Sequence, residues 1–199
     1  MDKTRHLADK IEQLLPLFPA IAVIGPRQCG KSTLLQQLRP QWRYYDLESP
    51  DDYQLVSHDP VSFFTLNPQA LLLDEVQQYP ELFRVLRGVI DQERKSKGRF
   101  LLTGSSSPDI TRGIHESLAG RIATVELAPF KQSELYGHPL PALYALLTDA
   151  QTRPQDFLAL PAGISLEQSM HAWLHGGYPD PCWKVHKPLL STSYGWTTI

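Results

Sequence analysis

The segment Gly25–Ser32 (GPRQCGKS) constrains the fold of this 199-residue chain more than any other part of it. It fits the pattern G-x-x-x-x-G-K-[ST] at every fixed position, directly after the apolar run Ala20–Ile24 and before a predicted helix over 31–38. Glycines let the backbone curl so that successive N–H groups face inward around an anion, and the amino end of the helix adds a partial positive charge. The pattern therefore predicts a phosphate-binding loop between a buried parallel strand and a helix.

We expect this loop to hold the phosphates of a nucleotide. Lys31 would reach the β- and γ-phosphates, and the Ser32 hydroxyl would bind Mg²⁺. Cys29 is expected to be a small filler residue, although a helix N-terminus lowers the pKa of a nearby thiol and would make it sensitive to oxidation. The predicted nucleotide contacts are Gly25, Pro26, Arg27, Gln28, Cys29, Gly30, Lys31, Ser32 and Thr33.

Two acidic residues, Asp74 and Glu75, follow the apolar run Leu71–Leu73. We expect Asp74 to hold Mg²⁺ directly or through water, and Glu75 to orient and deprotonate an attacking water molecule. The alternative is a pair of solvated acids at a strand end. A water-activating glutamate favours a nucleoside triphosphate hydrolase over a small-molecule kinase, because a kinase needs a pocket for its acceptor hydroxyl.

Candidate groups also follow two further predicted strands. Ligands bind beyond the carboxyl ends of parallel strands, so a hydroxyl after Phe100–Leu102 is expected near the γ-phosphate or the attacking water. Ser105 is the first candidate and Thr103 the second, and a serine-rich turn is the alternative. Arg121 is expected to stabilise transition-state charge, in its own chain or on a neighbouring subunit, with a surface or structural arginine as the alternative.

The alternation of short apolar runs with amphipathic segments predicts a three-layer α/β sandwich with a mainly parallel sheet. We expect an N-terminal helix in 1–17, an α/β nucleotide-binding core in 18–130, and an incomplete, mostly helical or irregular segment in 131–199. Helices are predicted over 4–15, 31–38, 80–97, 132–136 and 167–174, strands over 20–24, 42–47, 70–73, 100–103 and 122–127, a partly helical stretch over 51–67, and a polar loop over 104–108.

Charge and apolar patterning exclude several classes of protein. The chain has 19 Lys and Arg against 21 Asp and Glu, a net charge of −2, so no global basic field points to nucleic acid. No run approaches the ~18 apolar residues of a membrane span, and the polar start of the chain lacks the pattern of a signal peptide. Two cysteines far apart in sequence form no disulfide framework, which is typical of a cytoplasmic protein.

Two minor patterns have ordinary structural interpretations. The cations between Arg84 and Arg99 are more typical of a solvated helix face than of a nucleic-acid patch. His171 and His175 have a zinc-binding spacing but no clear third ligand, which favours a structural or surface role.

Six motifs occur in an order that resembles a known family: GPRQCGKSTLL, LLLDEVQQYPELFRVLRGVID, RFLLTGSSS, SLAGR, ELAPFKQSEL and GGYPDP. Together they are similar to the prokaryotic AAA+-superfamily P-loop ATPases that carry a C-terminal domain of unknown function, over about residues 18–180. The resemblance implies ATP and Mg²⁺ as ligands, Asp74 and Glu75 as the Walker B pair, and a sensor position within Thr103–Ser105. It also matches Arg121 to the arginine of the fourth motif.

The end of the chain departs from this family, whose members continue after GGYP with a long C-terminal region. Here the chain ends at Ile199. The codons of Gly195–Ile199, read one base earlier, permit WMDDY, which resembles the aromatic and acidic helix of the family. We hypothesise a frameshift or truncation near residue 185, which predicts family-like coding sequence downstream in another frame.

The motifs together predict Mg²⁺-dependent ATP hydrolysis. One alternative is a nucleotide-dependent switch or a truncated remnant that does not hydrolyse ATP. Another is a P-loop small-molecule kinase, which would need an arginine-rich lid that residues 138–163 do not offer. A role of Arg121 in a neighbouring subunit would require a homo-oligomer. A protein or DNA partner stays open, and no membrane partner is expected.

Overall fold

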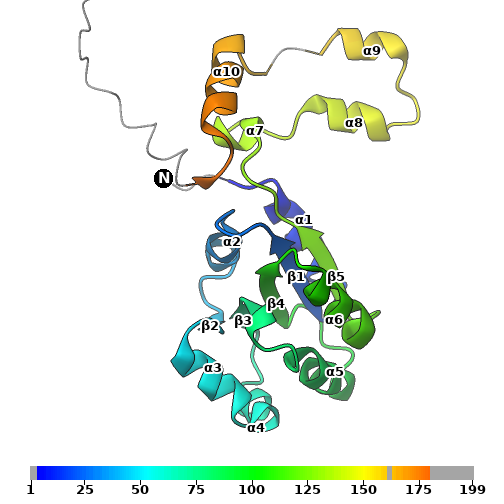
Figure 1. Ribbon diagram of the computed structural model, residues 1–199. Coiled ribbons are helices and arrows are strands. Elements are labelled where there is room, and N and C mark those ends of the chain that lie inside the picture. The colour runs from blue at the N-terminus through cyan, green and yellow to red at the C-terminus, as the bar shows by residue number, and fades with distance from the viewer. Residues whose placement is uncertain (1–3, 161–162, 180–199) are drawn as a thin grey trace, which may run out of the picture. The chain divides into compact units, whose positions relative to one another are not determined.

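Five parallel strands form a single sheet in the first of two units, which ends at Pro129. The structure is a computed structural model that describes residues 4–160 and 163–179. The strand order is β2-β3-β4-β1-β5, so β1 lies between β4 and β5 (Figure 1). The strands are β1 (Ala20–Gly25), β2 (Arg43–Asp46), β3 (Leu71–Asp74), β4 (Phe100–Ser105) and β5 (Ile122–Glu126).

The short apolar runs form strands because the sheet is buried on both faces, where β-branched and leucine side chains pack well. Successive side chains point to opposite faces, and the structure separates them accordingly. Leu71 and Leu73 belong to one hydrophobic cluster, whereas Leu72 belongs to another. In β4, likewise, Phe100 and Leu102 face one cluster and Leu101 the other.

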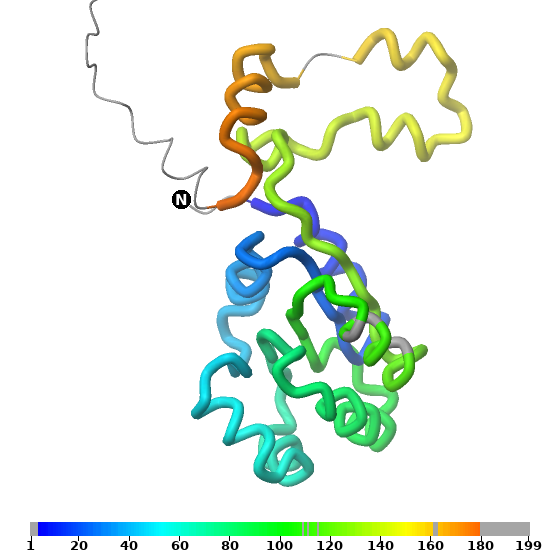
Figure 2. The backbone as a smooth tube through the Cα atoms, in the orientation of Figure 1, coloured from blue at the N-terminus to red at the C-terminus, as the bar shows by residue number. Residues whose placement is uncertain are grey.

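Helices cover both faces and complete three layers (Figure 2). The cluster that contains Leu72 is closed by α1 (Leu7–Leu14) and α2 (Lys31–Leu38). The opposite cluster is closed by α3 (Pro50–Ser57), α4 (Pro60–Leu66), α5 (Leu82–Gln92) and α6 (Pro108–Leu118), and a single 3₁₀ turn, η1 (Val76–Gln78), follows β3. The predicted three-layer α/β fold with a parallel sheet is confirmed.

One expected helix was too long, and one helix was not predicted. The helix predicted over 80–97 ends at Gln92, because its buried positions end at Ile90 and residues 93–97 offer no apolar side chain to the core. The region after the predicted loop 104–108 forms α6, which the sequence analysis did not include. The Ser107 hydroxyl caps α6 by accepting the Ile110 N–H at 3.4 Å.

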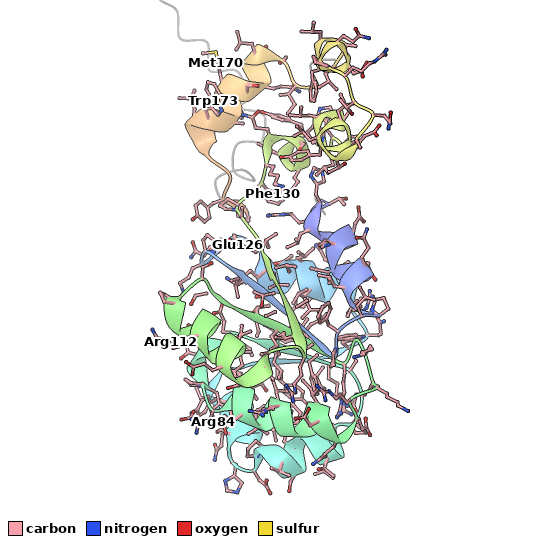
Figure 3. The ribbon with its side chains drawn as sticks, turned by 90° about the vertical axis from the view of Figure 1, so that its right-hand side faces the viewer. Arg84, Arg112, Glu126, Phe130, Met170 and Trp173 are labelled. Carbon is pink, nitrogen blue, oxygen red and sulfur yellow. The ribbon has the colours of Figure 1, made fainter. Side chains whose placement is uncertain are left out.

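The second unit begins at Phe130, and its described part is mostly helical. Its small core joins Leu135, Ala172 and Tyr136, while Met170 and Trp173 of α10 are exposed (Figure 3). None of the helices in the described residues is long and apolar enough to span a membrane. The helices are α7 (Gln132–Leu135), α8 (Ala142–Thr148), α9 (Pro154–Leu158) and α10 (Leu166–His175).

The histidine pair and the residues of the frameshift hypothesis both belong to this unit. The rings of His171 and His175 stack with centroids 4.3 Å apart, and the part of the chain that the structure describes holds no cluster of three metal-ligating side chains. A zinc site therefore gains no support. The residues on which the frameshift hypothesis rests lie outside the described residues.

Truncation of a central core side chain tests this architecture. We expect Leu102→Ala to lower the free energy of unfolding by about 2–5 kcal/mol, because Leu102 is fully buried in β4 and its removal leaves a cavity. Leu66→Ala is the matched control, since Leu66 is 78% exposed on α4. Urea unfolding measures both variants, and equal destabilisation of the two would contradict the proposed core.

Candidate functional site

The loop after β1 follows a path that only glycine permits at two positions. A Cβ atom on Gly25 would lie 2.3 Å from the Leu127 carbonyl oxygen, so any side chain there would displace backbone. Gly30, which precedes α2, has a φ of 93°, a left-handed conformation that is unfavourable for other residues. Gln28 adopts a φ of 61°, so the loop holds one non-glycine residue in the left-handed region as well.

Lys31 is the first residue of α2, and its side chain folds back over the loop. Its ammonium Nζ donates to the carbonyl oxygens of Pro26 at 3.0 Å and Gly25 at 3.3 Å. The residue is only 4% exposed. A fixed positive charge therefore lies where the curled backbone and the amino end of α2 also favour an anion.

The Asp74 carboxyl group, at the end of β3, accepts hydrogen bonds from three hydroxyl groups. Ser32 of α2 donates to Oδ1 at 2.9 Å, and Tyr44 of β2 donates to Oδ2 at 2.6 Å. Thr103 of β4 also donates to Oδ1. Burial, reinforced by the bond to Asp74, raises the pKa of Tyr44 far above its ordinary value, so its hydroxyl keeps the proton that it donates.

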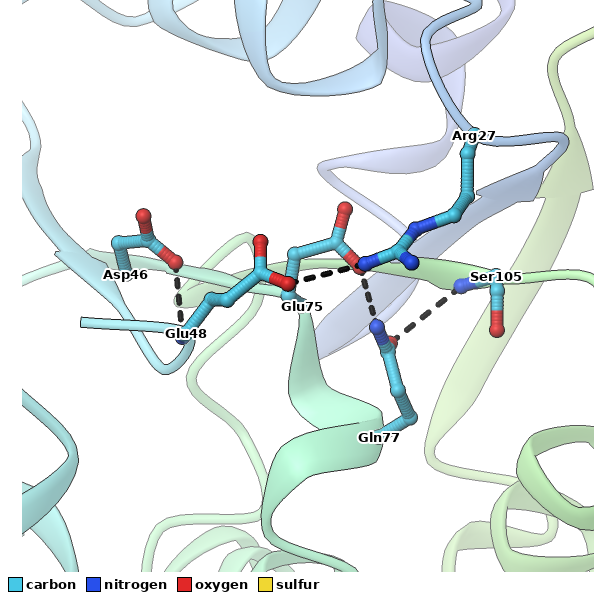
Figure 4. Close-up of polar contacts among 6 residues, drawn as sticks. All are labelled: Arg27, Asp46, Glu48, Glu75, Gln77 and Ser105. Carbon is cyan, nitrogen blue, oxygen red and sulfur yellow. Dashed lines mark hydrogen bonds and ion pairs between the residues drawn. The ribbon is translucent and has the colours of Figure 1, made fainter. Parts of the chain in front are cut away.

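Glu75 is held by a second set of contacts. Its φ of 52° places it in the left-handed region, where its N–H donates to the Thr103 hydroxyl at 3.0 Å. Its carboxylate accepts a hydrogen bond from the Gln77 amide, and the Gln77 Oε1 accepts the Ser105 N–H at 3.3 Å (Figure 4). The Glu75 side chain is therefore tied to the end of β4 through Gln77.

Arg27, at the outer part of the loop, pairs with an acidic residue beyond β2. Its Nη2 lies 2.9 Å from Glu48 Oε1, and both side chains are more than half exposed (Figure 4). The Glu48 N–H in turn donates to Asp46 at 2.9 Å. This pair connects the loop to the segment after β2 at the same edge of the sheet.

Cys29 is enclosed within the loop. Its thiol donates to the Leu127 carbonyl at 3.3 Å, and its own carbonyl accepts a hydrogen bond from Arg5 at 3.2 Å. Burial raises the pKa of this thiol, which outweighs the opposing effects of Lys31 and Arg5. Desolvation therefore opposes the effect of the helix N-terminus that would make this thiol sensitive to oxidation, and the enclosed position agrees with a small filler residue.

Arg121 lies at the amino ends of the strands, whereas the loop and the two acids lie at their carboxyl ends. Its carbonyl accepts the N–H of Ala20, the first residue of β1. Its Nε and Nη2 both donate to the Asp91 carboxylate at 2.8 Å. Since β1 has six residues, about 20 Å of strand separates Arg121 from the loop. A contact between Arg121 and phosphate in the same chain, one of our two expectations, was wrong.

Several residues around the phosphate loop and the two acids were not predicted from the sequence. Tyr44 and Gln77 contact the two acids directly, and Arg5 anchors the loop through the Cys29 carbonyl and the Ala128 carbonyl. Tyr44 could have been predicted from the sequence, because parallel pairing places the polar ends of β2 and β3 together. Arg5 has none, since its contacts span 24 and 123 residues of sequence.

The oxygen atoms of Ser32 and Asp74 fit a magnesium ion. Both are hard oxygen donors, they lie 2.9 Å apart, and they stand beside the anion-binding loop. Mg²⁺ commonly takes one or two protein ligands and completes its octahedron with water and phosphate oxygens. The residues present are therefore suited to a phosphate-bound Mg²⁺ ion.

Comparisons with known proteins agree with this geometry. Residues 17–136 match a family model described as "AAA domain". Two uncharacterised proteins, Mb2031c of Mycobacterium bovis and Rv2008c of Mycobacterium tuberculosis, are each 36% identical over 127 residues, which cover 62% of this chain and 28% of theirs. The match thus spans little more than a quarter of the length of these relatives.

A solved structure resembles the fold. The Walker-type ATPase PABY2304 of Pyrococcus abyssi superposes with a TM-score of 0.51 and 18% sequence identity. The match covers 92% of this chain and 65% of that chain. At this identity the likeness concerns the fold alone.

The environment of Cys29 gives a chemical test of the loop. We expect Cys29 to resist alkylation by iodoacetamide at mildly alkaline pH, because its side chain is fully buried and its raised pKa keeps the thiolate scarce. Peptide mass spectrometry measures the modification, with urea-unfolded protein as the reactive control. Rapid modification in the folded protein would contradict the enclosed position of Cys29.

Proposed function

Because the chain belongs to the AAA domain family of P-loop ATPases, we propose that it binds ATP with Mg²⁺ and hydrolyses it. The observation that carries the proposal is the position of the Asp74 carboxyl group. A single hydrogen bond of 2.9 Å joins it to Ser32, the last residue of the phosphate-loop pattern, and Glu75 follows immediately. The groups that we propose to bind phosphate and to activate water therefore lie close together, at the carboxyl ends of the strands.

We assign the phosphates of ATP to the loop and the first turn of α2. Backbone N–H groups would surround the phosphate oxygens, and the Lys31 ammonium would exchange its two carbonyl acceptors for the β- and γ-phosphates. Arg27 would keep the outer part of the loop in place through Glu48. The proposed contacts are Gly25, Pro26, Arg27, Gln28, Cys29, Gly30, Lys31, Ser32 and Thr33.

Ser32 and Asp74 are the proposed metal ligands. When bound there, Mg²⁺ would compensate the charge of the β- and γ-phosphate oxygens. Tyr44 and Thr103 hold the Asp74 carboxyl group in position from two neighbouring strands. Because these bonds come from rigid elements, the carboxyl group needs little rearrangement to meet its ligand.

Glu75 is the proposed general base. A water molecule would give its proton to the Glu75 carboxylate while its oxygen attacks the γ-phosphorus, and the bond from that phosphorus to the bridging oxygen of ADP would break. Gln77 would act as a positioning residue, because its amide donates to the Glu75 carboxylate and also accepts the Ser105 N–H. Thr103 or Ser105 would serve as the sensor hydroxyl at the end of β4.

Arg121 enters the proposal only as a group from a neighbouring subunit. It directly precedes the edge strand β5, at the end of the strands remote from its own loop, so it would serve a second copy in a homo-oligomer. The sequence and its buried free cysteine fit a cytoplasmic setting. The process that hydrolysis drives would be defined by a protein or DNA partner.

Substitution of Lys31 and Glu75 separates binding from turnover. We expect Lys31→Ala to weaken ATP binding at least about tenfold, through loss of a charge-assisted contact. Glu75→Gln should retain ATP binding and lower kcat about 10²–10⁴-fold. Lys97→Ala and Glu81→Gln are matched controls at exposed positions of the same unit. Equilibrium titration with ATP and Mg²⁺-dependent phosphate release measure the two effects.

The outcomes distinguish the alternatives. Equal phosphate release by wild type and Glu75→Gln would contradict the proposed mechanism. Tight ATP binding by wild type without phosphate release would contradict hydrolysis and support a nucleotide-dependent switch. Absence of ATP binding would contradict the proposed function as a whole.

Gln77 supplies a test of positioning. We expect Gln77→Leu to lower kcat while the Kd for ATP stays within about twofold of wild type, because the amide contacts Glu75 and does not contact the loop in the described structure. Gln78→Leu is the matched control on the same 3₁₀ turn. An unchanged kcat in Gln77→Leu would contradict the positioning role.

A further inference from the structure

The Tyr44 hydroxyl occupies one oxygen of the carboxyl group that we assign to the metal site. Tyr44 lies in β2 opposite Leu72 of β3, and Asp74 follows Leu72 by two residues, on the same face of the sheet. The Tyr44 side chain packs against the hydrophobic cluster that contains Leu72. Its hydroxyl donates to Asp74 Oδ2 at 2.6 Å. The contact therefore follows from the register of two neighbouring strands.

The two oxygens of Asp74 have different partners. Ser32 and Thr103 both donate to Oδ1, whereas Tyr44 is the one donor to Oδ2 among the described residues. An ionised carboxylate has about four lone-pair positions, two on each oxygen. The hydroxyl groups of Ser32 and Thr103 therefore fill Oδ1, and Oδ2 is the oxygen with capacity left.

The bond from Tyr44 fixes the orientation of the carboxyl group. With it, Asp74 is anchored through both oxygens, from α2, β2 and β4. Without it, the anchors would all lie on Oδ1, and Oδ2 could turn toward an ion beside Ser32. Asp74 is only 4% exposed, so solvent has little access to replace the hydroxyl. Tyr44 thus decides how many oxygens Asp74 can offer to one ion.

Mg²⁺ and Ca²⁺ differ in the number of oxygens that they require. Mg²⁺ is small, demands an octahedral shell of about six ligands, and keeps several of its waters. Ca²⁺ takes about six to eight oxygens in a flexible shell, often including both oxygens of one carboxylate. A carboxyl group that is prevented from giving its second oxygen therefore suits Mg²⁺ better than Ca²⁺.

We propose that Tyr44 determines the metal specificity of the nucleotide site and makes it favour Mg²⁺ over Ca²⁺. By holding Asp74 Oδ2, its hydroxyl keeps the carboxyl group from giving two oxygens to one ion. Tyr44 acts through Asp74 and is therefore a positioning residue. The inference rests on the proposed function, because it concerns the ion that accompanies ATP.

Tyr45 supplies a matched control. It is the next residue of β2, and its side chain packs against the cluster on the opposite face of the sheet. Its hydroxyl donates to the Asn67 side chain at 3.4 Å. Tyr45→Phe therefore removes the same atom from the same strand and leaves the contacts of Asp74 unchanged.

The test measures ATP binding to the full chain by isothermal titration calorimetry. The parent protein carries Glu75→Gln, which is expected to prevent turnover, and Tyr44→Phe or Tyr45→Phe is added to it. Each protein is titrated in excess Mg²⁺, in excess Ca²⁺ and in EDTA. Because excess metal saturates free ATP, the ratio of the Kd in Ca²⁺ to the Kd in Mg²⁺ reports the preference of the site.

Tyr44→Phe should change the metal preference without changing the loop. We expect it to lower the Kd ratio at least about threefold, mainly through tighter binding in Ca²⁺. The Kd in EDTA should stay within about twofold of the parent, since the contacts of the loop with phosphate do not involve Tyr44. Tyr45→Phe should leave the ratio unchanged.

The possible failures are distinguishable. An unchanged ratio in Tyr44→Phe, with ATP binding intact in the parent, would overturn this inference and leave the proposed function standing. An equal loss of affinity in all three conditions would also overturn it, because Tyr44 would then only support the fold. A parent that binds no ATP in any condition would contradict the proposed function, and this inference with it.

Discussion

The Asp74 carboxyl group is the point on which the candidate site depends. Three hydroxyl groups, from Ser32, Tyr44 and Thr103, donate to its two oxygens, and each comes from a different element. An acidic side chain that is only 4% exposed requires such partners, because a buried polar group without hydrogen bonds is costly. The same bonds hold α2, β2, β3 and β4 together, so they position the groups of the site and also stabilise the packing of these elements.

The position of β1 inside the sheet explains the close packing around Gly25 and Cys29 of the phosphate loop. Because β1 lies between β4 and β5, its last residue meets Ser105 on one side and the chain after β5 on the other. The close approach of Leu127 leaves no room for a side chain on Gly25, and the Cys29 thiol fills the space beneath the loop. The phosphate loop is therefore shaped by β5 as well as by its own glycines.

The sequence predicted the strands and the loop well because both depend on local patterns. Short apolar runs that end at proline or glycine are typical of strands buried on both faces. The loop glycines are required by the local backbone conformation and by the close approach of other atoms. What it missed depends on contacts between distant segments. The bonds from Tyr44 and Gln77 to the acids, and the position of Arg121 beside Asp91, follow from strand order and register. Desolvation of Cys29 likewise arises only when Leu127 closes over it.

The most direct test of the central claim is a crystal structure of the Glu75→Gln variant with ATP and Mg²⁺. We expect the Lys31 ammonium to leave the carbonyl oxygens of Gly25 and Pro26 and to contact the β- and γ-phosphates. The metal ion should lie beside the oxygens of Ser32 and Asp74. Nucleotide bound away from the loop, or phosphates at the loop with no ion at Ser32 and Asp74, would contradict the proposal.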